Sequence, residues 1–246
     1  AAFVYRAFYF KEFKSAVISS IISLSLYGFF RFIVAHIRMP LQSFIPIMAT
    51  SQAEKLLSIP KIFAYYINNF FFPLNLAIAQ HWVVRNINFE DFYLPLIELL
   101  STMVILGLLY LFIKKINYKL TNTFIFCLTI FTTGLVAHMH IIPLYMTVAD
   151  RWFYVPSVGL IGIIGVVLTL ITQKISSLSK SIFLALGIII IVLLAGRTFV
   201  RGFDWRDGFT LYSQDIKINT TSFDLENNLG NEYYKRGNLQ EAKKHF

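Results

Sequence analysis

Apolar stretches long enough to cross a membrane, separated by short basic segments, dominate this sequence. A membrane-spanning helix needs roughly 20 mostly apolar residues, and the fixed charges leave five such stretches, at residues 15–37, 92–113, 120–142, 152–173 and 181–200. Hydrophobic residues make up 57% of the 246 residues and charged residues only 14%, whereas soluble domains contain about 25% charged residues. We therefore predict an all-α, polytopic membrane helix bundle.

A sixth apolar stretch, residues 57–84, has a different character. Its body carries the amides of Asn68, Asn69 and Asn75 and the helix breaker Pro73. Three amides and a proline suit a segment at the membrane surface, or one that re-enters the membrane, better than a helix surrounded by lipid. We predict that residues 57–84 are interfacial or re-entrant.

Basic residues are unequally distributed among the connecting segments. Segments 1–14, 114–120 and 174–180 together hold eight Lys and Arg, whereas the segment 141–151 holds one, Arg151. Loops rich in Lys and Arg remain in the cytoplasm, and five spans with a non-spanning 57–84 satisfy that rule. The predicted extracytoplasmic parts are residues 38–91, 141–152 and everything after residue 197. Because topology accounts for the net charge of +9, we predict no nucleic-acid partner.

The tail changes character after the predicted membrane domain, residues 1–200. Residues 201–222 are polar and aromatic and are typical of a linker with short helices. Residues 223–246 follow the pattern of a first, incomplete tetratricopeptide repeat, in which small residues let two helices pack closely and aromatic residues fill the seam. The matching positions are Leu229, Gly230, Tyr233, Gly237, Ala242 and Phe246. One repeat cannot bury its own face, so we expect a tetratricopeptide α-solenoid to continue in the parent protein.

Asp150 and Arg151 stand side by side where the span 152–173 begins. In one interpretation they form an interfacial ion pair that ends one helix and starts the next, anchored by Trp152 and Tyr154. In the other, Arg151 contacts an anionic headgroup, because a guanidinium binds phosphate through two parallel hydrogen bonds, and Asp150 holds it in place.

Further polar residues lie within or near the spans. Arg31 interrupts the first span, where an ionisable residue faces a protein interior or a water-filled cavity, unless it reaches the outer surface. His138 and His140 point to different sides of a helix, which favours lining a polar cavity over binding one metal ion. We predict no metal site and identify no cofactor, and the sequence leaves open whether the reaction uses a divalent cation. We interpret Arg197, Arg201 and their neighbours as juxtamembrane anchors.

Three features stand in order along the chain: "YGFFRF" in the first span, "VADRWFYVPSVGL" at the start of a later span, and the repeat. This order resembles the C-terminal membrane half of the transmembrane and tetratricopeptide-repeat O-mannosyltransferases and their bacterial relatives. The resemblance covers about residues 17–246. Its most specific part is the acid–Arg pair followed by Tyr154 and the Pro-Ser-x-Gly of residues 156–159.

The resemblance implies a GT-C type glycosyltransferase in a bacterial inner membrane or an endoplasmic reticulum membrane. Its reaction is transfer of a mannose-like sugar from a polyprenyl-phosphate donor to a hydroxyl of an acceptor protein, on the extracytoplasmic face, with the repeats binding the acceptor. Arg151, Asp150 and Arg31 would contact the donor phosphate, and the cavity would be lined by His138, His140 and Tyr154. The family's catalytic acid lies in the first outer loop, which we expect upstream of this sequence, so we assign no catalytic residue.

Two other functions fit part of the sequence. A non-catalytic membrane-anchored scaffold that displays repeats would have no polar cavity behind Asp150 and Arg151. An envelope polysaccharide ligase or polymerase would have a large late outer loop carrying Arg and His, whereas the segment 141–152 is short.

Overall fold

The computed structural model describes residues 13–34, 45–141, 144–220 and 222–246. Within this part of the chain the regular elements are all helices, and one antiparallel bridge joins Gln80 to Val148. The prediction of an all-α membrane protein is confirmed, because four of the helices are long and apolar enough to cross a membrane. These four helical stretches are Phe89–Ile116, Tyr118–Val136, Asp150–Gln173 and Ser177–Asp204.

Each of the four stretches corresponds to one predicted span. The first joins the π-helix η2 (Phe89–Tyr93) to α5 (Leu94–Ile116), and the second is α6 (Tyr118–Val136). The third joins the 3-10 helix η3 (Asp150–Phe153) to α7 (Tyr154–Lys174), and the fourth is α8 (Ser177–Asp204). The first predicted span, residues 15–37, overlaps α2 (Phe13–Gly28) and includes the π-helix η1 (Phe29–Val34).

One predicted boundary is wrong, because α6 ends at Val136 rather than near residue 142. His138 Nδ1 makes a hydrogen bond of 2.8 Å with the carbonyl of Gly134, which the helix leaves without a backbone partner. The backbone then turns at His140, whose φ is 57°. An apolar sequence through this region therefore forms a folded loop, not further helix.

Helices α6 and α7 pack closely because glycine replaces larger residues at their contact. A Cβ added at Gly159 would lie 2.4 Å from the backbone nitrogen of Phe131 and 2.6 Å from the carbonyl oxygen of Cys127. A Cβ at Gly162 would lie 2.4 Å from Cys127 Sγ. Small residues bring backbones together where lipid provides no hydrophobic drive between helices, so these two helices form the best-packed part of the membrane region.

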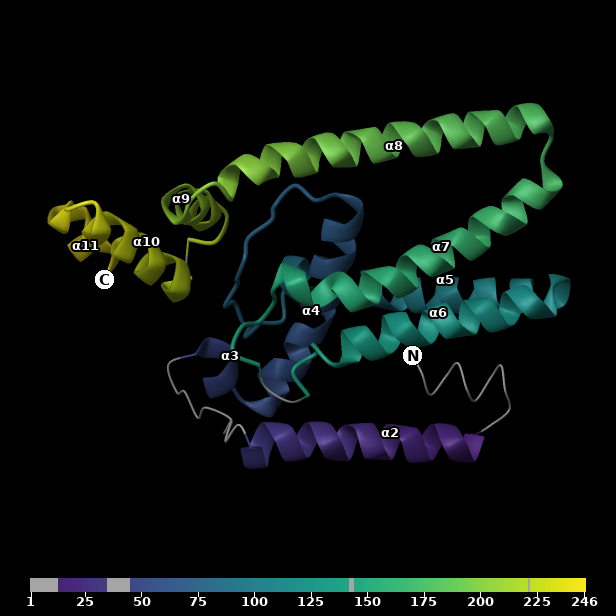
Figure 1. Ribbon diagram of the computed structural model, residues 1–246, viewed down its shortest axis with the longest axis horizontal. Coiled ribbons are helices and arrows are strands. Elements are labelled where there is room, and N and C mark those ends of the chain that lie inside the picture. The colour runs from purple at the N-terminus through teal and green to yellow at the C-terminus, as the bar shows by residue number, and fades with distance from the viewer. Residues whose placement is uncertain (1–12, 35–44, 142–143, 221) are drawn as a thin grey trace.

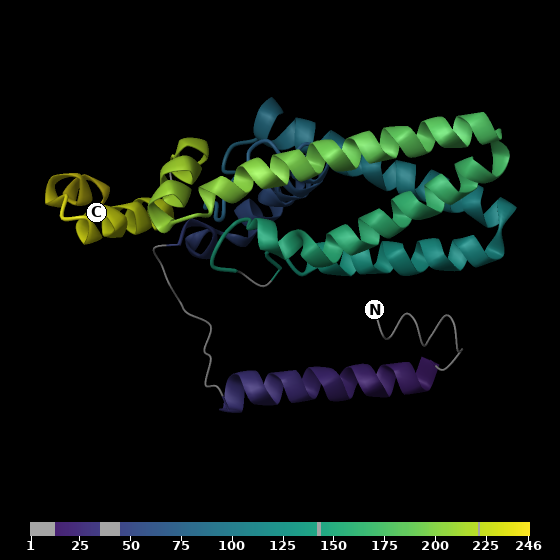
Figure 2. The ribbon, with the colours of Figure 1, turned by 45° about the horizontal axis from the view of Figure 1, so that its top comes forward.

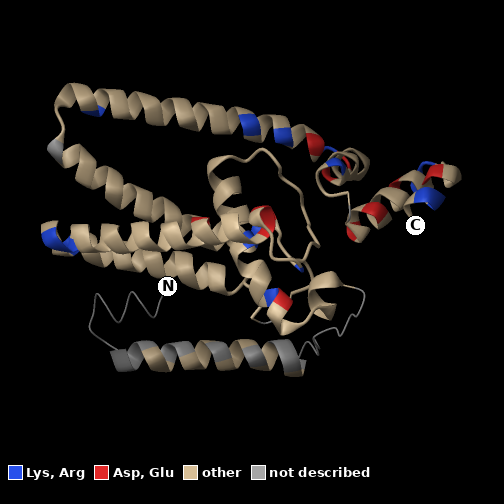
Figure 3. Cartoon of the chain, turned by 180° about the vertical axis from the view of Figure 1, so that it is seen from behind, with Lys and Arg blue, Asp and Glu red and all other residues tan. Residues whose placement is uncertain are grey.

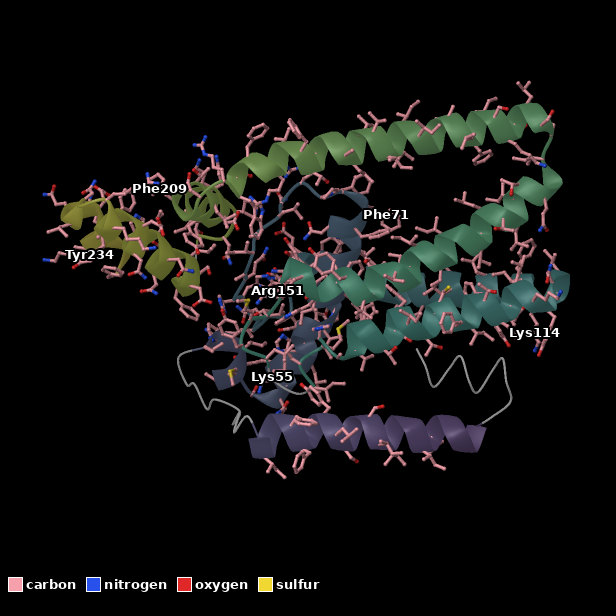
Figure 4. All side chains as sticks on the ribbon, viewed as in Figure 1. Lys55, Phe71, Lys114, Arg151, Phe209 and Tyr234 are labelled. Atoms are coloured by element: carbon pink, nitrogen blue, oxygen red, sulfur yellow. The ribbon has the colours of Figure 1, made fainter. Side chains whose placement is uncertain are left out.

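The bundle has two chemically different ends (Figure 1). The α5–α6 and α7–α8 turns lie together at one end, where Figure 3 shows basic residues in blue at the α5–α6 turn and Figure 4 labels Lys114. The loop 72–88 and residues 137–141 and 144–149 lie at the other end, and the C-terminal helices extend beyond it in both ribbon views (Figure 2). We call this second end the site end.

Residues 57–84 are divided between a helix and an irregular loop. After the short α3 (Pro46–Ala49), α4 (Gln52–Phe71) begins with a reciprocal capping box between Ser51 and Glu54. It ends two residues before Pro73, in keeping with the restriction that proline imposes on the residues before it. Residues 72–88 then cross the site end without regular structure. The interfacial position of this segment stays a prediction.

The tail folds into three helices, α9 (Gly208–Ile218), α10 (Phe223–Lys235) and α11 (Leu239–His245). Leu229 and Ala242 are buried between α10 and α11. A Cβ at Gly230 would lie 2.9 Å from the Phe246 ring, and Gly237 has a φ of 76° in the turn. The pair thus has the tight helical hairpin geometry that the repeat pattern requires, and its identity as a tetratricopeptide repeat stays a prediction.

Candidate functional site

Asp150 lies at the site end and binds a residue that is distant in sequence. The Tyr65 hydroxyl, from α4, donates a hydrogen bond of 2.6 Å to Asp150 Oδ1. Burial raises the pKa of Tyr65, and the negative charge of Asp150 raises it further. Tyr66 stacks on Phe153 with ring centroids 5.2 Å apart and an angle of 7° between the planes. These contacts fix the start of α7 against α4.

Arg151 points elsewhere, so the prediction that Asp150 holds it in place is wrong. Side chains of consecutive residues stand about 120° apart around a helix with three residues per turn, and both residues belong to η3. Arg151 is exposed, and its Nη2 lies 3.7 Å from Met146 Sδ. Among the described residues no carboxylate lies within ion-pair distance of it. Figure 4 shows Arg151 at the site end.

Three cavities lie along the α4 face that carries the tyrosines and asparagines. The Asp150 cavity, of about 240 Å³, is lined by Asp150, Tyr66, Asn69, Phe70, Pro73 and Phe153, among others. The amide cavity, of about 520 Å³, is lined by Tyr65, Asn68, Asn69, Asn75, Gln80 and Lys217, with Ile218. The Glu98 cavity, of about 340 Å³, includes Lys61, Tyr65, Asn68, Gln80, Trp82 and Glu98. The amide cavity shares Asn69 with the Asp150 cavity, and it shares Tyr65, Asn68 and Gln80 with the Glu98 cavity, so polar residues of α4 connect the three linings.

The two histidines hold the loop that follows α6. His138 stacks on Trp152 with ring centroids 5.2 Å apart. His140 is buried, and its Nε2 lies 2.8 Å from the carbonyl oxygen of Thr147. Burial lowers the pKa of His140, which favours the neutral ring, although the hydrogen bond to the Thr147 carbonyl partly opposes this shift. The three cavities described above are lined by other residues, and Tyr154 is 74% exposed.

Two further sequence predictions concern Arg31 and the metal site. Arg31 belongs to η1, but its side chain lies outside the described residues. Glu98, a potential partner for an arginine, instead accepts a hydrogen bond of 3.2 Å from Asn68 Nδ2. In the part of the chain that the structure describes, no group of three or more His, Cys, Asp and Glu residues is placed to hold a metal ion.

Arg197 and Arg201, near the end of α8, bind the loop 72–88 and the tail instead of serving only as membrane anchors. Arg197 donates hydrogen bonds to the carbonyl oxygens of Pro73, at 2.9 Å, and Leu74, at 3.0 Å. Arg201 is 8% exposed and contacts the buried carboxylate of Asp215, on α9, at 2.6 Å. The end of α8 is therefore tied to both the loop and the tail.

The tail also contacts the loop directly. Asp215 Oδ2 accepts a hydrogen bond of 2.9 Å from the backbone N–H of Ile78. His81 Nε2 lies 2.9 Å from Asp224 Oδ2, and the His81 ring packs over Phe223 at 4.5 Å. Burial lowers the pKa of His81, although the nearby Asp224 carboxylate partly opposes this shift. We call the contacts that join Arg201, Ile78 and His81 to the tail the latch.

Sequence reasoning missed Tyr65, Gln80 and Asp215. The tyrosines and asparagines of "AYYINN" were a signal, because polar residues in an apolar stretch require partners. Gln80 and Asp215 had no comparable signal. Gln80 accepts from Trp82 Nε1 and pairs through its backbone with Val148, which only folding brings near.

Comparison with known proteins gives three related curated sequences. The chain is 33% identical to human protein O-mannosyl-transferase TMTC3 over 108 residues, which is 42% of this chain and 11% of the relative. It is 32% identical to the mouse protein over 104 residues, 42% of this chain and 11% of the relative, and 30% identical to Drosophila melanogaster Tmtc3 over 132 residues, 53% of this chain and 14% of the relative. The chain is a distant homologue of these O-mannosyl-transferases.

This similarity agrees with the family resemblance drawn from the sequence. The chain spans between about a tenth and a seventh of the length of these relatives. No family model matches it, and no solved structure matches it significantly. Together with the four apolar helices, the homology supports a membrane protein related to glycosyltransferases.

Proposed function

We propose that this chain is part of an integral membrane glycosyltransferase that transfers a mannose-like sugar from a polyprenyl-phosphate donor to a protein hydroxyl. The observation that carries the proposal is the exposed guanidinium of Arg151 at the first turn of an apolar helix, in a chain homologous to O-mannosyl-transferases. Its guanidinium contacts Met146 Sδ, a weak acceptor, and no carboxylate among the described residues, so its planar fork can still form charge-assisted hydrogen bonds with a phosphate. A membrane boundary is the level at which a polyprenyl phosphate presents its headgroup.

The arrangement of charge supports an extracytoplasmic position for the site. Lys114, in the last turn of α5, lies at the end of the bundle opposite Arg151 (Figure 4). If the basic turns face the cytoplasm, then the site end and the C-terminal helices face the opposite side. The acceptor protein, bound by the predicted tetratricopeptide repeats, would therefore approach the donor from that side.

The geometry counts against a purely structural scaffold. That function predicts no polar cavity behind Asp150 and Arg151. The Asp150 cavity, of about 240 Å³, is lined mainly by apolar side chains, but it shares Asn69 with the larger amide cavity, whose lining is polar. Asp150 itself accepts a hydrogen bond from Tyr65. We assign Asp150 a positioning role, since this hydrogen bond holds η3 against α4.

The test is sugar transfer by the full-length protein carrying Arg151→Ala. We expect transfer from a polyprenyl-phosphate hexose to fall at least tenfold, equivalent to about 1.4 kcal/mol of lost transition-state stabilisation, with an unchanged unfolding temperature. Arg151→Lys should retain part of the activity, because lysine keeps the charge but not the bidentate geometry. Arg85→Ala is the matched control, since the Arg85 side chain is also exposed. Full transfer by the Arg151→Ala protein removes this residue from the site.

A further inference from the structure

The amide cavity has a lining that differs in chemistry from the rest of the membrane domain. Its volume of about 520 Å³ falls within the range of about 300–1,000 Å³ typical of small-molecule sites. Four carboxamides line it, from Asn68, Asn69, Asn75 and Gln80, and Lys217 adds a cation from α9. No carboxylate belongs to this lining, which favours a neutral polar ligand over a cation.

Carboxamides match the hydrogen-bonding pattern of a sugar ring. Each amide side chain offers two N–H donors and an oxygen with two lone pairs. Each hydroxyl of a pyranose both donates and accepts, so neighbouring hydroxyls can be held by several amides at once. Tyr65 adds the flat apolar surface of an aromatic ring to the same cavity, and such a ring suits the C–H face of a pyranose.

Two of these amides are already held in fixed orientations. Asn68 donates from Nδ2 to Glu98 Oε2 at 3.2 Å, and Gln80 accepts at Oε1 from Trp82 Nε1 at 2.8 Å. The Asn68 oxygen and the Gln80 N–H₂ group therefore keep defined directions before a ligand arrives. A preorganised set of polar groups loses little conformational freedom on binding.

Asn69 gives an independent indication that this region takes a polar ligand. Its Nδ2 is buried, and within the described residues it has no hydrogen-bond partner. Buried polar groups in native proteins are almost always hydrogen-bonded, because an unsatisfied donor loses water without compensation. Asn69 lines both the amide cavity and the Asp150 cavity, so a ligand that satisfied it would lie next to Asp150.

We propose that the amide cavity binds the pyranose ring of a neutral hexose. Asn69, Asn75 and Gln80 hydrogen-bond its hydroxyls, and the Lys217 ammonium donates to an oxygen at the rim. This inference rests on the proposed glycosyltransferase function and assigns the sugar of that reaction to one cavity. Arg151 does not line this cavity, so in this proposal it binds the phosphate of the donor.

The direct test measures sugar binding without catalysis. Methyl α-mannopyranoside is titrated against the full-length protein in lipid nanodiscs and followed by saturation-transfer-difference NMR, in wild type and in Asn69→Leu. Leucine matches asparagine in size and lacks its hydrogen-bonding groups, so we expect the dissociation constant to rise at least tenfold. Asn86→Leu, an exposed asparagine of the same loop region, should bind as wild type does.

A second variant guards against loss of folding. Lys217 is exposed, so Lys217→Met should fold normally and weaken binding severalfold. Sugar binding that stays within twofold of wild type in both variants overturns the amide cavity as the sugar site.

The same proteins separate this inference from the proposed function. Amide-dependent sugar binding in a protein that transfers no sugar supports the cavity and refutes the transferase. Normal transfer by both Asn69→Leu and Lys217→Met refutes the cavity and leaves the transferase standing.

Discussion

Replacing Asp215 with alanine should release the loop 72–88 from the C-terminal tail. The carboxylate has zero relative exposure and makes two contacts in the latch, 2.6 Å to Arg201 Nη2 and 2.9 Å to the backbone nitrogen of Ile78. Its removal leaves a largely buried guanidinium with one carboxylate, Asp204 at 3.0 Å, and leaves the Ile78 N–H without its acceptor.

The expected size of the effect follows from the burial of this ion pair. Truncating one partner of a buried pair costs about 3–5 kcal/mol. Because Asp204 still neutralises Arg201, we expect the lower end of that range, about 3 kcal/mol, which corresponds to roughly a 150-fold larger population of the released state. Asp215→Asn should lie between the two proteins, since an amide oxygen still accepts from Ile78 but carries no charge.

Hydrogen exchange in the full-length protein is the suitable assay, because exchange reports local opening free energies. The amide of Ile78 should exchange roughly 150-fold faster in Asp215→Ala, given that estimate. The control is Glu241→Ala, which removes an exposed partner of Lys244 and should matter little, since exposed pairs contribute about 0–1 kcal/mol. Acceleration of Ile78 below about fivefold, which corresponds to about 1 kcal/mol, would refute the claim that this ion pair holds the tail.

Two further predictions concern the membrane helices and pH. Gly159→Leu should strongly lower the unfolding temperature in detergent, because its Cβ alone would approach the backbone of α6 to 2.4 Å. Gly165→Leu is the control and should be tolerated, because a Cβ at Gly165 meets nothing within 4 Å. Equal effects of the two substitutions would contradict the proposed packing of α6 and α7. Burial lowers the pKa of His81 more than the nearby Asp224 carboxylate raises it, so the docked tail favours neutral His81. When the tail is released, His81 takes up a proton near its ordinary pKa of about 6.5. Docking should therefore weaken as pH falls below about 6.5, seen as faster exchange of residues 78–82, and a pH profile that His81→Asn leaves unchanged would assign the effect to another group.

The membrane helices could be predicted because crossing a lipid bilayer is a local requirement. Each segment must satisfy its own backbone hydrogen bonds and present apolar side chains along its length, so the relevant information lies within about 20 consecutive residues. The end of α6 escaped this reasoning. His138 and His140 fold back onto Gly134 and Thr147, and hydropathy does not distinguish such a loop from helix.

From the sequence, only isolated residues of the candidate site could be predicted, and not their contacts. Asp150 and Arg151 were conspicuous because charges at an apolar boundary require an explanation. Their binding partners were not conspicuous in the sequence, and Asp150 and Arg151 do not bind each other. Tyr65 lies 85 positions from Asp150, its hydrogen-bond partner, and no periodicity connects residues so far apart.

The sequence by itself determined which segments are membrane helices, which loops are basic and where the helical tail begins, since each depends on neighbouring residues. Only the tertiary structure decided that Asp150 faces α4, that Arg151 turns toward Met146 instead of Asp150, and that Asp215 joins the tail to Ile78 across 137 positions. The physical reason is that a buried polar group takes whichever partner the packing of distant helices places within about 3 Å.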